Sequence, residues 1–171
     1  EYVDMIGGNF DGHPWGHQGT YCICNEDSNH VIVKGIFGGE RNFTLNDELY
    51  QYKDFHRDKV RVLLSIDMSK FENHRGGRKR EDNDYALAWV KKFGKGRIFV
   101  SSPGHNHHIY WNKEILKMWY RGFRFALGEM DAETESIPKP SFSLPPQEGE
   151  QSPSVRFKTP EESQKTFQLQ D

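Results

Sequence analysis

YALAWVKKFGKGRIFVSSPGH, residues 85–105, is the stretch that decides the fold of this chain. Residues 85–92 and 97–101 are both rich in apolar and β-branched side chains. Between them, residues 93–96 read Phe-Gly-Lys-Gly, a glycine-containing turn. Two strand-like runs that are joined by so short a turn predict a β-hairpin.

The chain beyond the hairpin changes its hydrophobic period. From Ile115 to Leu127 apolar residues recur every three or four positions, which is typical of an amphipathic helix. Asn112 is suited to cap the start of this helix and Gly128 to end it. We therefore expect a helix directly after the hairpin.

Three segments on the amino-terminal side complete the outline. Residues 20–25 alternate between two faces and predict a strand, and residues 59–67 form an apolar run of the length of a buried strand. Residues 1–6 are interpreted as the end of a helix that the Gly7-Gly8 pair closes. The sequence therefore predicts a mixed α/β domain over residues 1–128.

Composition excludes several classes of protein. The chain has 171 residues, of which 13% are aromatic, so it has enough large apolar side chains for a core. No apolar run approaches the ~20 residues of a membrane span. The net charge of −2 divides into +3 over residues 1–128 and −5 over 129–171, too small a surplus for a nucleic-acid surface. Two cysteines make no disulfide framework and no zinc-binding pair.

The last 43 residues differ from the rest. Residues 129–158 are rich in Pro, Ser and Glu, which predicts a disordered linker. Residues 159–171 begin with Thr159, Pro160 and Glu162, the pattern of a capping box, and predict the start of a following domain. Because the chain opens on Glu1, we expect it to be part of a longer protein.

His105 is the first candidate for chemistry. It follows the strand that ends at Ser101, and Gly104 lets the backbone turn tightly so that the imidazole projects outward. A neutral imidazole suits either proton abstraction or metal binding. His107 and His108 are interpreted as residues of a surface loop.

Two further segments offer partners. In the first, Pro14 biases His13 toward an extended conformation, and Trp15 is either an apolar wall for a sugar ring or a core residue. In the second, an extended backbone would turn Asp47 and Leu49 to one side and Glu48 and Tyr50 to the other. That segment is either a carboxylate and phenol site for a polyol or an edge strand with a solvated acid.

Strings in five places resemble the trehalose-utilisation, or ThuA-like, family. These are GGNFDGHPW at 7–15, HVIVKGI at 30–36, DELYQY at 47–52, AWVKKFGKGRIFVSSPGH at 88–105 and FALG at 125–128. The residues that fall on recurrent positions of the family are His13, Asp47, Glu48, Tyr50, Gly104 and His105. The segment 85–87 departs from the family pattern, in which an X-Pro pair is common.

The resemblance implies a flavodoxin-like, three-layer α/β fold similar to class I glutamine amidotransferases, with the first, parallel strands upstream of Glu1. It does not imply amidotransferase activity, because the family generally lacks the nucleophilic cysteine. It implies a role in the use of trehalose or keto-sugars. The end of the chain, residues 159–171, resembles the opening of a dehydrogenase-like propeller module in exported planctomycete-type bacterial proteins, so we expect a periplasmic or exported, multidomain context.

Two hypotheses about function follow. In the first, the domain is a carbohydrate enzyme: His105, Glu48 and Asp47 are catalytic, and His13, Trp15, Tyr50 and Gly104 bind the sugar. A divalent metal such as zinc would be held by His13, His105 and a carboxylate. In the second, the domain is a non-catalytic module that binds a carbohydrate or docks on a neighbouring domain.

Overall fold

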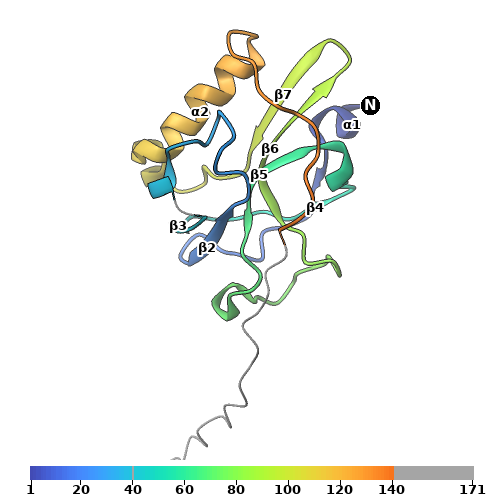
Figure 1. The fold of residues 1–171 in the computed structure, drawn as a ribbon. Coiled ribbons are helices and arrows are strands. Elements are labelled where there is room, and N and C mark those ends of the chain that lie inside the picture. Colours follow the sequence, from blue (N-terminus) through green and yellow to red (C-terminus); the bar gives the residue numbers. More distant parts are fainter. Residues whose placement is uncertain (40, 141–171) are drawn as a thin grey trace, which may run out of the picture. The chain divides into compact units, whose positions relative to one another are not determined.

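The computed structural model describes residues 1–39 and 41–140 (Figure 1). Its strands are β1 (Asn9–Phe10), β2 (Thr20–Asn25), β3 (Asn42–Asn46), β4 (Tyr52–Lys53), β5 (Arg61–Ile66), β6 (Ala86–Phe93) and β7 (Gly96–Ser101). Its helices are α1 (Tyr2–Ile6), α2 (Lys113–Ala126) and the short η1 (Phe37–Gly39), η2 (Arg57–Lys59), η3 (Phe71–Asn73) and η4 (His107–Trp111). These elements confirm the mixed α/β class.

The predicted hairpin and helix are both present. β6 and β7 pair from Ala88 with Ser101 to Phe93 with Gly96, across a two-residue turn in which Gly94 has a φ of 57°. Asn112 caps α2, because its side chain accepts hydrogen bonds from two main-chain N–H groups of the first turn. In the part of the chain that the structure describes, no helix is long and apolar enough to cross a membrane.

Five strands form one sheet, in the order β3-β2-β5-β6-β7. Each neighbouring pair is antiparallel. The chain therefore leaves β3, β5 and β7, and enters β2 and β6, at the same end of the sheet, which we call the exit end. The flavodoxin-like fold that the resemblance implies has parallel strands, whereas every neighbouring pair in this sheet is antiparallel. For β6 and β7, the two-residue turn at Gly94 permits only the antiparallel pairing.

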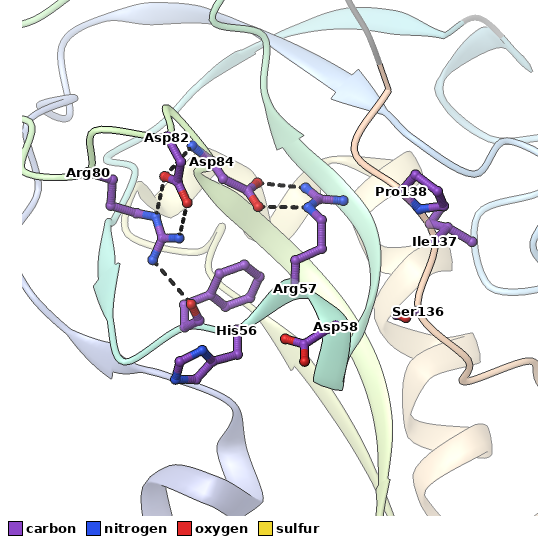
Figure 2. Close-up of a pocket in the computed structure, with 10 residues that line it drawn as sticks. His56, Arg57, Asp58, Arg80, Asp82, Asp84, Ser136, Ile137 and Pro138 are labelled. Atoms are coloured by element: carbon purple, nitrogen blue, oxygen red, sulfur yellow. Dashed lines mark hydrogen bonds and ion pairs between the residues drawn. The ribbon is translucent and has the colours of Figure 1, made fainter.

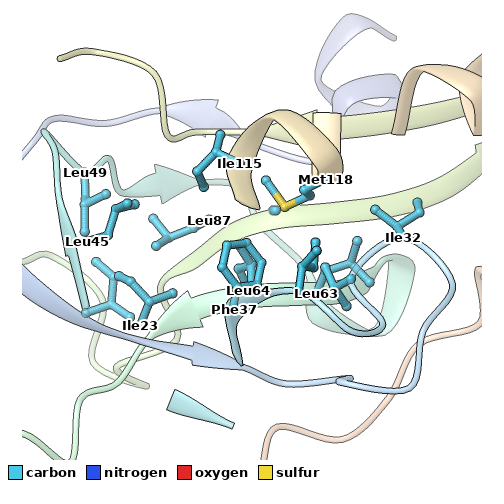
Figure 3. Packing of buried hydrophobic residues seen from close by; sticks show 14 of the residues in the cluster. Ile23, Ile32, Phe37, Leu45, Leu49, Leu63, Leu64, Leu87, Ile115 and Met118 are labelled. Atoms are coloured by element: carbon cyan, nitrogen blue, oxygen red, sulfur yellow. The ribbon is translucent and has the colours of Figure 1, made fainter. Parts of the chain in front are cut away.

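Apolar side chains fill both faces of the sheet. Trp89 and Val90 are neighbours on β6 and therefore point to opposite faces. Val90 belongs to the larger cluster, to which α2 contributes Ile115 and Met118 (Figure 3). Trp89 belongs to a smaller cluster and donates a hydrogen bond of 2.8 Å from Nε1 to the carbonyl of Ile6 in α1. α2 therefore packs on one face of the sheet and α1 contacts the other.

Residues 129–140 follow α2 and run back along the sheet, in orange in Figure 1. Long-range hydrogen bonds fix them: Arg97 to the carbonyl of Met130, His30 to that of Glu133, Arg61 to that of Glu135, and Lys139 to those of Asp82 and Asn83. The described part of the expected linker is thus packed on the domain. The remainder of that linker and the expected domain start at 159–171 lie outside the described residues.

Candidate functional site

Three loops meet at the exit end of the sheet. Residues 11–19 lead into β2, residues 47–51 follow β3, and residues 102–106 follow β7. Although β3 and β7 are opposite edges of the sheet, their loops are joined by a hydrogen bond across 59 positions of sequence. The alternating strand direction therefore gathers distant segments at one place.

Glu48 lies among three histidines at this place. Its Oε2 is 3.5 Å from Nδ1 of His13, and its Oε1 is 3.4 Å from Nδ1 of His105. The ring of His17 lies 5.9 Å from that of His105, measured between centroids. The side chain of Glu48 is 12% exposed, whereas those of His13 and His105 are 56% and 44% exposed. We call His13, His17, Glu48 and His105 the Glu48 cluster: a sheltered carboxylate with imidazoles around its opening.

Asp47, which the sequence analysis placed beside Glu48 as a catalytic carboxylate, has a different position. It is fully buried, and its two carboxylate oxygens accept hydrogen bonds from the main-chain N–H groups of Gly104 (2.6 Å) and Asn106 (2.7 Å). Both oxygens are therefore engaged with the loop that carries His105. Asp47 positions that loop and does not face a ligand.

Trp15 also departs from its expected role as a sugar-binding wall. Its side chain is fully buried in the larger core cluster, and its Nε1 donates a hydrogen bond of 2.8 Å to the carbonyl of Asn73. An antiparallel bridge between Trp15 and Leu49 fixes the loop of Glu48 against this core. The core interpretation of Trp15, left open by the sequence, is the one that the structure supports.

Tyr50 and Gly104 line a cavity instead. Its volume is about 440 Å³, and we call it the aromatic pocket; its lining residues are Tyr50, Phe99, Ser101, Ser102, Pro103, Gly104, Tyr110, Trp119 and Phe123. Burial, and then the charge of Glu48, raise the pKa of the Tyr50 phenol. Tyr50 therefore remains a hydrogen-bond donor at neutral pH.

Two residues of the site were not assigned by sequence reasoning. His17 belongs to the Glu48 cluster, and its spacing of four residues from His13 is a signal that could have indicated it. Asn106 joins the three loops: its side-chain nitrogen donates to the carbonyl of His17 (2.8 Å) and to that of Asn46 (3.3 Å). No pattern in the sequence identifies an asparagine with that role.

A divalent cation fits three members of the cluster. One ligand atom from each of His17, Glu48 and His105 lies within 4.8 Å of the others. Zinc ligands lie about 2.0–2.1 Å from the ion, and Nδ1 of His105 is 3.4 Å from Oε1 of Glu48. Two imidazoles and one carboxylate form a donor set that catalytic zinc uses, with one position left open. His17 therefore replaces His13 in the metal set expected from the sequence.

The cysteines offer no nucleophile. Burial raises the pKa of the Cys24 thiol to about 11. Burial and a hydrogen bond to Glu72 also raise the pKa of Cys22. Because the thiolate is the reactive form, neither side chain is activated at neutral pH.

A larger cavity of about 840 Å³ is lined by η2 and residues 136–138 (Figure 2). Its main charges pair with one another. Arg57 donates to both oxygens of Asp84 (2.6 and 2.7 Å) and to Glu26, and Arg80 pairs with Asp82. The pairing of Arg57 with Asp84 holds η2 against the segment that leads into β6. We therefore interpret this cavity as structural.

Comparisons with known proteins give a family match and a structural neighbour. The model of the ThuA family, described as trehalose utilisation, matches residues 1–126. The structure is similar to the crystal structure of a putative ThuA-like protein from Bacteroides uniformis, with a TM-score of 0.56 and 19% sequence identity. That similarity covers 73% of this chain and 50% of the other, so the chain spans about half the length of this neighbour. No curated protein matches the chain. With a family match over most of its length, the chain belongs to the ThuA family.

Proposed function

We propose that this domain processes a carbohydrate at the Glu48 cluster, by proton transfer at a hydroxyl or at a carbon beside the carbonyl of a keto-sugar. The observation that carries the proposal is the sheltered carboxylate of Glu48, which lies 3.5 Å and 3.4 Å from the imidazoles of two loops. The family description, trehalose utilisation, supports a sugar as the substrate.

His13 is assigned the proton transfer. Its Nδ1 faces Glu48 Oε2, so the carboxylate orients the ring, while Nε2 is left for the substrate. The side chain is 56% exposed, which leaves the ring accessible to a ligand. Typical general acid–base catalysis contributes about 10²–10⁴-fold in rate.

His105 is assigned to a cation, the second of the two roles that the sequence left open for it. His17, Glu48 and His105 would hold a divalent ion such as zinc. When bound, that ion supplies a Lewis acid for a sugar oxygen. Asp47 keeps His105 in place through the main chain of its loop.

The test measures the exchange of a substrate hydrogen for deuterium and does not require a complete reaction. The full chain is incubated with a keto derivative of trehalose in D₂O, and loss of the C–H signal beside the carbonyl is followed by NMR. We expect Glu48→Gln and His13→Gln to slow exchange by about 10²-fold or more. His107→Gln, an exposed histidine outside the cluster, is the matched control.

Elemental analysis tests the cation separately. Wild-type protein should hold one equivalent of metal and His17→Ala should lose it. Exchange at the wild-type rate in Glu48→Gln overturns the catalytic proposal. Sugar binding by a wild-type protein that shows no exchange supports the alternative, a non-catalytic carbohydrate-binding module.

The wider context is proposed on the resemblance alone. We propose that the antiparallel sheet is one part of a flavodoxin-like domain, that a dehydrogenase-like propeller follows residue 171, and that the bacterial protein is exported. The reading frame on both sides of this sequence tests all three, because it must encode parallel strands and a signal peptide upstream and the propeller downstream.

A further inference from the structure

We propose that the aromatic pocket is the subsite for a neutral, unphosphorylated sugar ring, which it holds beside the Glu48 cluster. This inference rests on the proposed function and names the substrate class of the same site. Its volume of about 440 Å³ lies in the range of roughly 300–1,000 Å³ that is usual for small-molecule sites.

Aromatic side chains form much of the pocket wall. Trp119 and Tyr110 meet edge to face, with centroids 5.4 Å apart and an angle of 61°, and Phe123 and Tyr50 add further walls. Aromatic faces carry negative charge, and the C–H bonds on one face of a sugar ring present weak positive charge to them. A sugar ring is therefore a ligand that fits these walls without requiring a charged partner.

The pocket also contains hydroxyl groups that can bind those of a sugar. Ser101 Oγ accepts a hydrogen bond of 2.9 Å from Trp119 Nε1, which leaves its own O–H free to donate. The hydroxyl of Tyr110 donates to the carbonyl of Gly104 (3.0 Å), which leaves its oxygen free to accept. Tyr50 adds a phenol donor. Donors and acceptors in an aromatic site match the alternating hydroxyls of a sugar.

The lining of the pocket is uncharged. The residues that line the pocket include no Lys, Arg, His, Asp or Glu. Recognition of a phosphate or a sugar acid depends on cationic side chains, above all Arg. The pocket therefore favours a free or glycosidically linked neutral sugar over a sugar phosphate.

The pocket shares two loops with the Glu48 cluster. Tyr50 lies on the same side of its extended segment as Glu48, whose charge acts on the phenol. Gly104 precedes His105 and has a φ of 144°; a Cβ there would lie 3.5 Å from the indole of Trp119. The pocket thus reaches two of the three loops that carry the cluster, those of Glu48 and His105, so a bound ring would lie beside these loops.

A protein partner is the competing occupant. The outer face of α2 exposes Leu116, Tyr120, Phe123 and Leu127, and Phe123 belongs to both that face and the pocket. The hydroxyls of the pocket favour the sugar, since a purely apolar partner would leave the O–H of Ser101 and the oxygen of Tyr110 without a further hydrogen-bond partner.

The test is a binding titration with trehalose and with trehalose 6-phosphate as the charged comparison, using the full chain and isothermal calorimetry. We expect trehalose to bind more tightly than its phosphate. Trp119→Ala and Phe123→Ala should each weaken trehalose binding by about tenfold. Trp111→Ala is the matched control, because Trp111 is 79% exposed on η4 and does not line the pocket.

Circular dichroism checks that each variant is folded, and Phe123→Ala removes a side chain that is already 60% exposed. Equal affinity of wild type and both pocket variants overturns the subsite. Tighter binding of the phosphate, or no binding of trehalose by wild type, also overturns it. If Glu48→Gln loses hydrogen exchange but binds trehalose normally, both proposals stand. If Trp119→Ala binds trehalose more weakly but Glu48→Gln exchanges hydrogen at the normal rate, only the proposed function is overturned.

Discussion

Replacing Asp47 tests whether the candidate site depends on one buried carboxylate. Asp47 is fully buried and accepts hydrogen bonds of 2.6 Å and 2.7 Å from the main chain of Gly104 and Asn106. A hydrogen bond to a charged group contributes about 1.5–3 kcal/mol. Asp47→Ala removes both and leaves two N–H groups without partners, so we expect the free energy of unfolding to fall by about 3–6 kcal/mol. Stabilities of about 5–15 kcal/mol are typical, so the variant should be marginal.

Asp47→Asn is the more selective change, because it keeps the shape. Its amide can accept with only one oxygen, so one of the two N–H groups loses its partner, at a cost of about 1.5–3 kcal/mol. Urea unfolding measures the stability, and amide hydrogen exchange at Gly104 and Asn106 reports the loop directly. Glu48→Gln is the matched control, since its polar contacts are imidazoles, and should change stability by less than about 1 kcal/mol. Unchanged stability and exchange in Asp47→Asn would refute the anchoring role.

Two further substitutions probe the frame around the site. Burial lowers the pKa of His30 below 6.5, and Nδ1 accepts a hydrogen bond from Ile32, so the folded domain resists protonation that the unfolded chain accepts. Stability should therefore fall as the pH drops from about 6.5 through the lowered pKa. The difference in melting temperature between about pH 7.5 and 5.5 should be smaller in His30→Gln than in wild type. Gly122→Ala should destabilise α2 although alanine favours helices by about 1 kcal/mol, because its Cβ would lie 2.3 Å from the ring of Phe99. A rise in the melting temperature of that variant would contradict the packing argument.

Most of the described fold could be predicted from local patterns. The turn at Gly94 and the cap at Asn112 are short-range signals, and β2, β5, β6, β7 and α2 appear within a few residues of their expected limits. The strands β1, β3 and β4 were not predicted. The order and direction of the strands could not be predicted, because they depend on contacts between segments far apart in sequence. Neither could the packing of residues 129–140, whose composition is that of a linker but whose main-chain carbonyls bind His30, Arg61 and Arg97.

The candidate site could be predicted only in part, because local patterns indicate some of its residues and contacts between distant segments determine the others. Position after a strand pointed to His105, and alternation along residues 47–50 pointed to a division between Asp47 and Glu48. Which member of that pair is buried depends on the loop from the opposite edge of the sheet, and this cannot be inferred from the segment itself. The burial of Trp15 has the same origin, because its indole bonds to Asn73, 58 positions away.

The adjacent carboxylates of Asp47 and Glu48 show how an antiparallel sheet can build a site at one end. Its two edge strands lie farthest apart within the sheet, so loops that leave them meet only if something holds them together. Asp47 supplies that link, and extended backbone then turns the next side chain, Glu48, to the other side, toward His13 and His105. A rigid anchor and a sheltered reactive group thus come from two consecutive residues. Exchanging them, as Asp47→Glu with Glu48→Asp, keeps composition and charge but misplaces both oxygen pairs by about one methylene, so both stability and proton exchange should fall in that double variant.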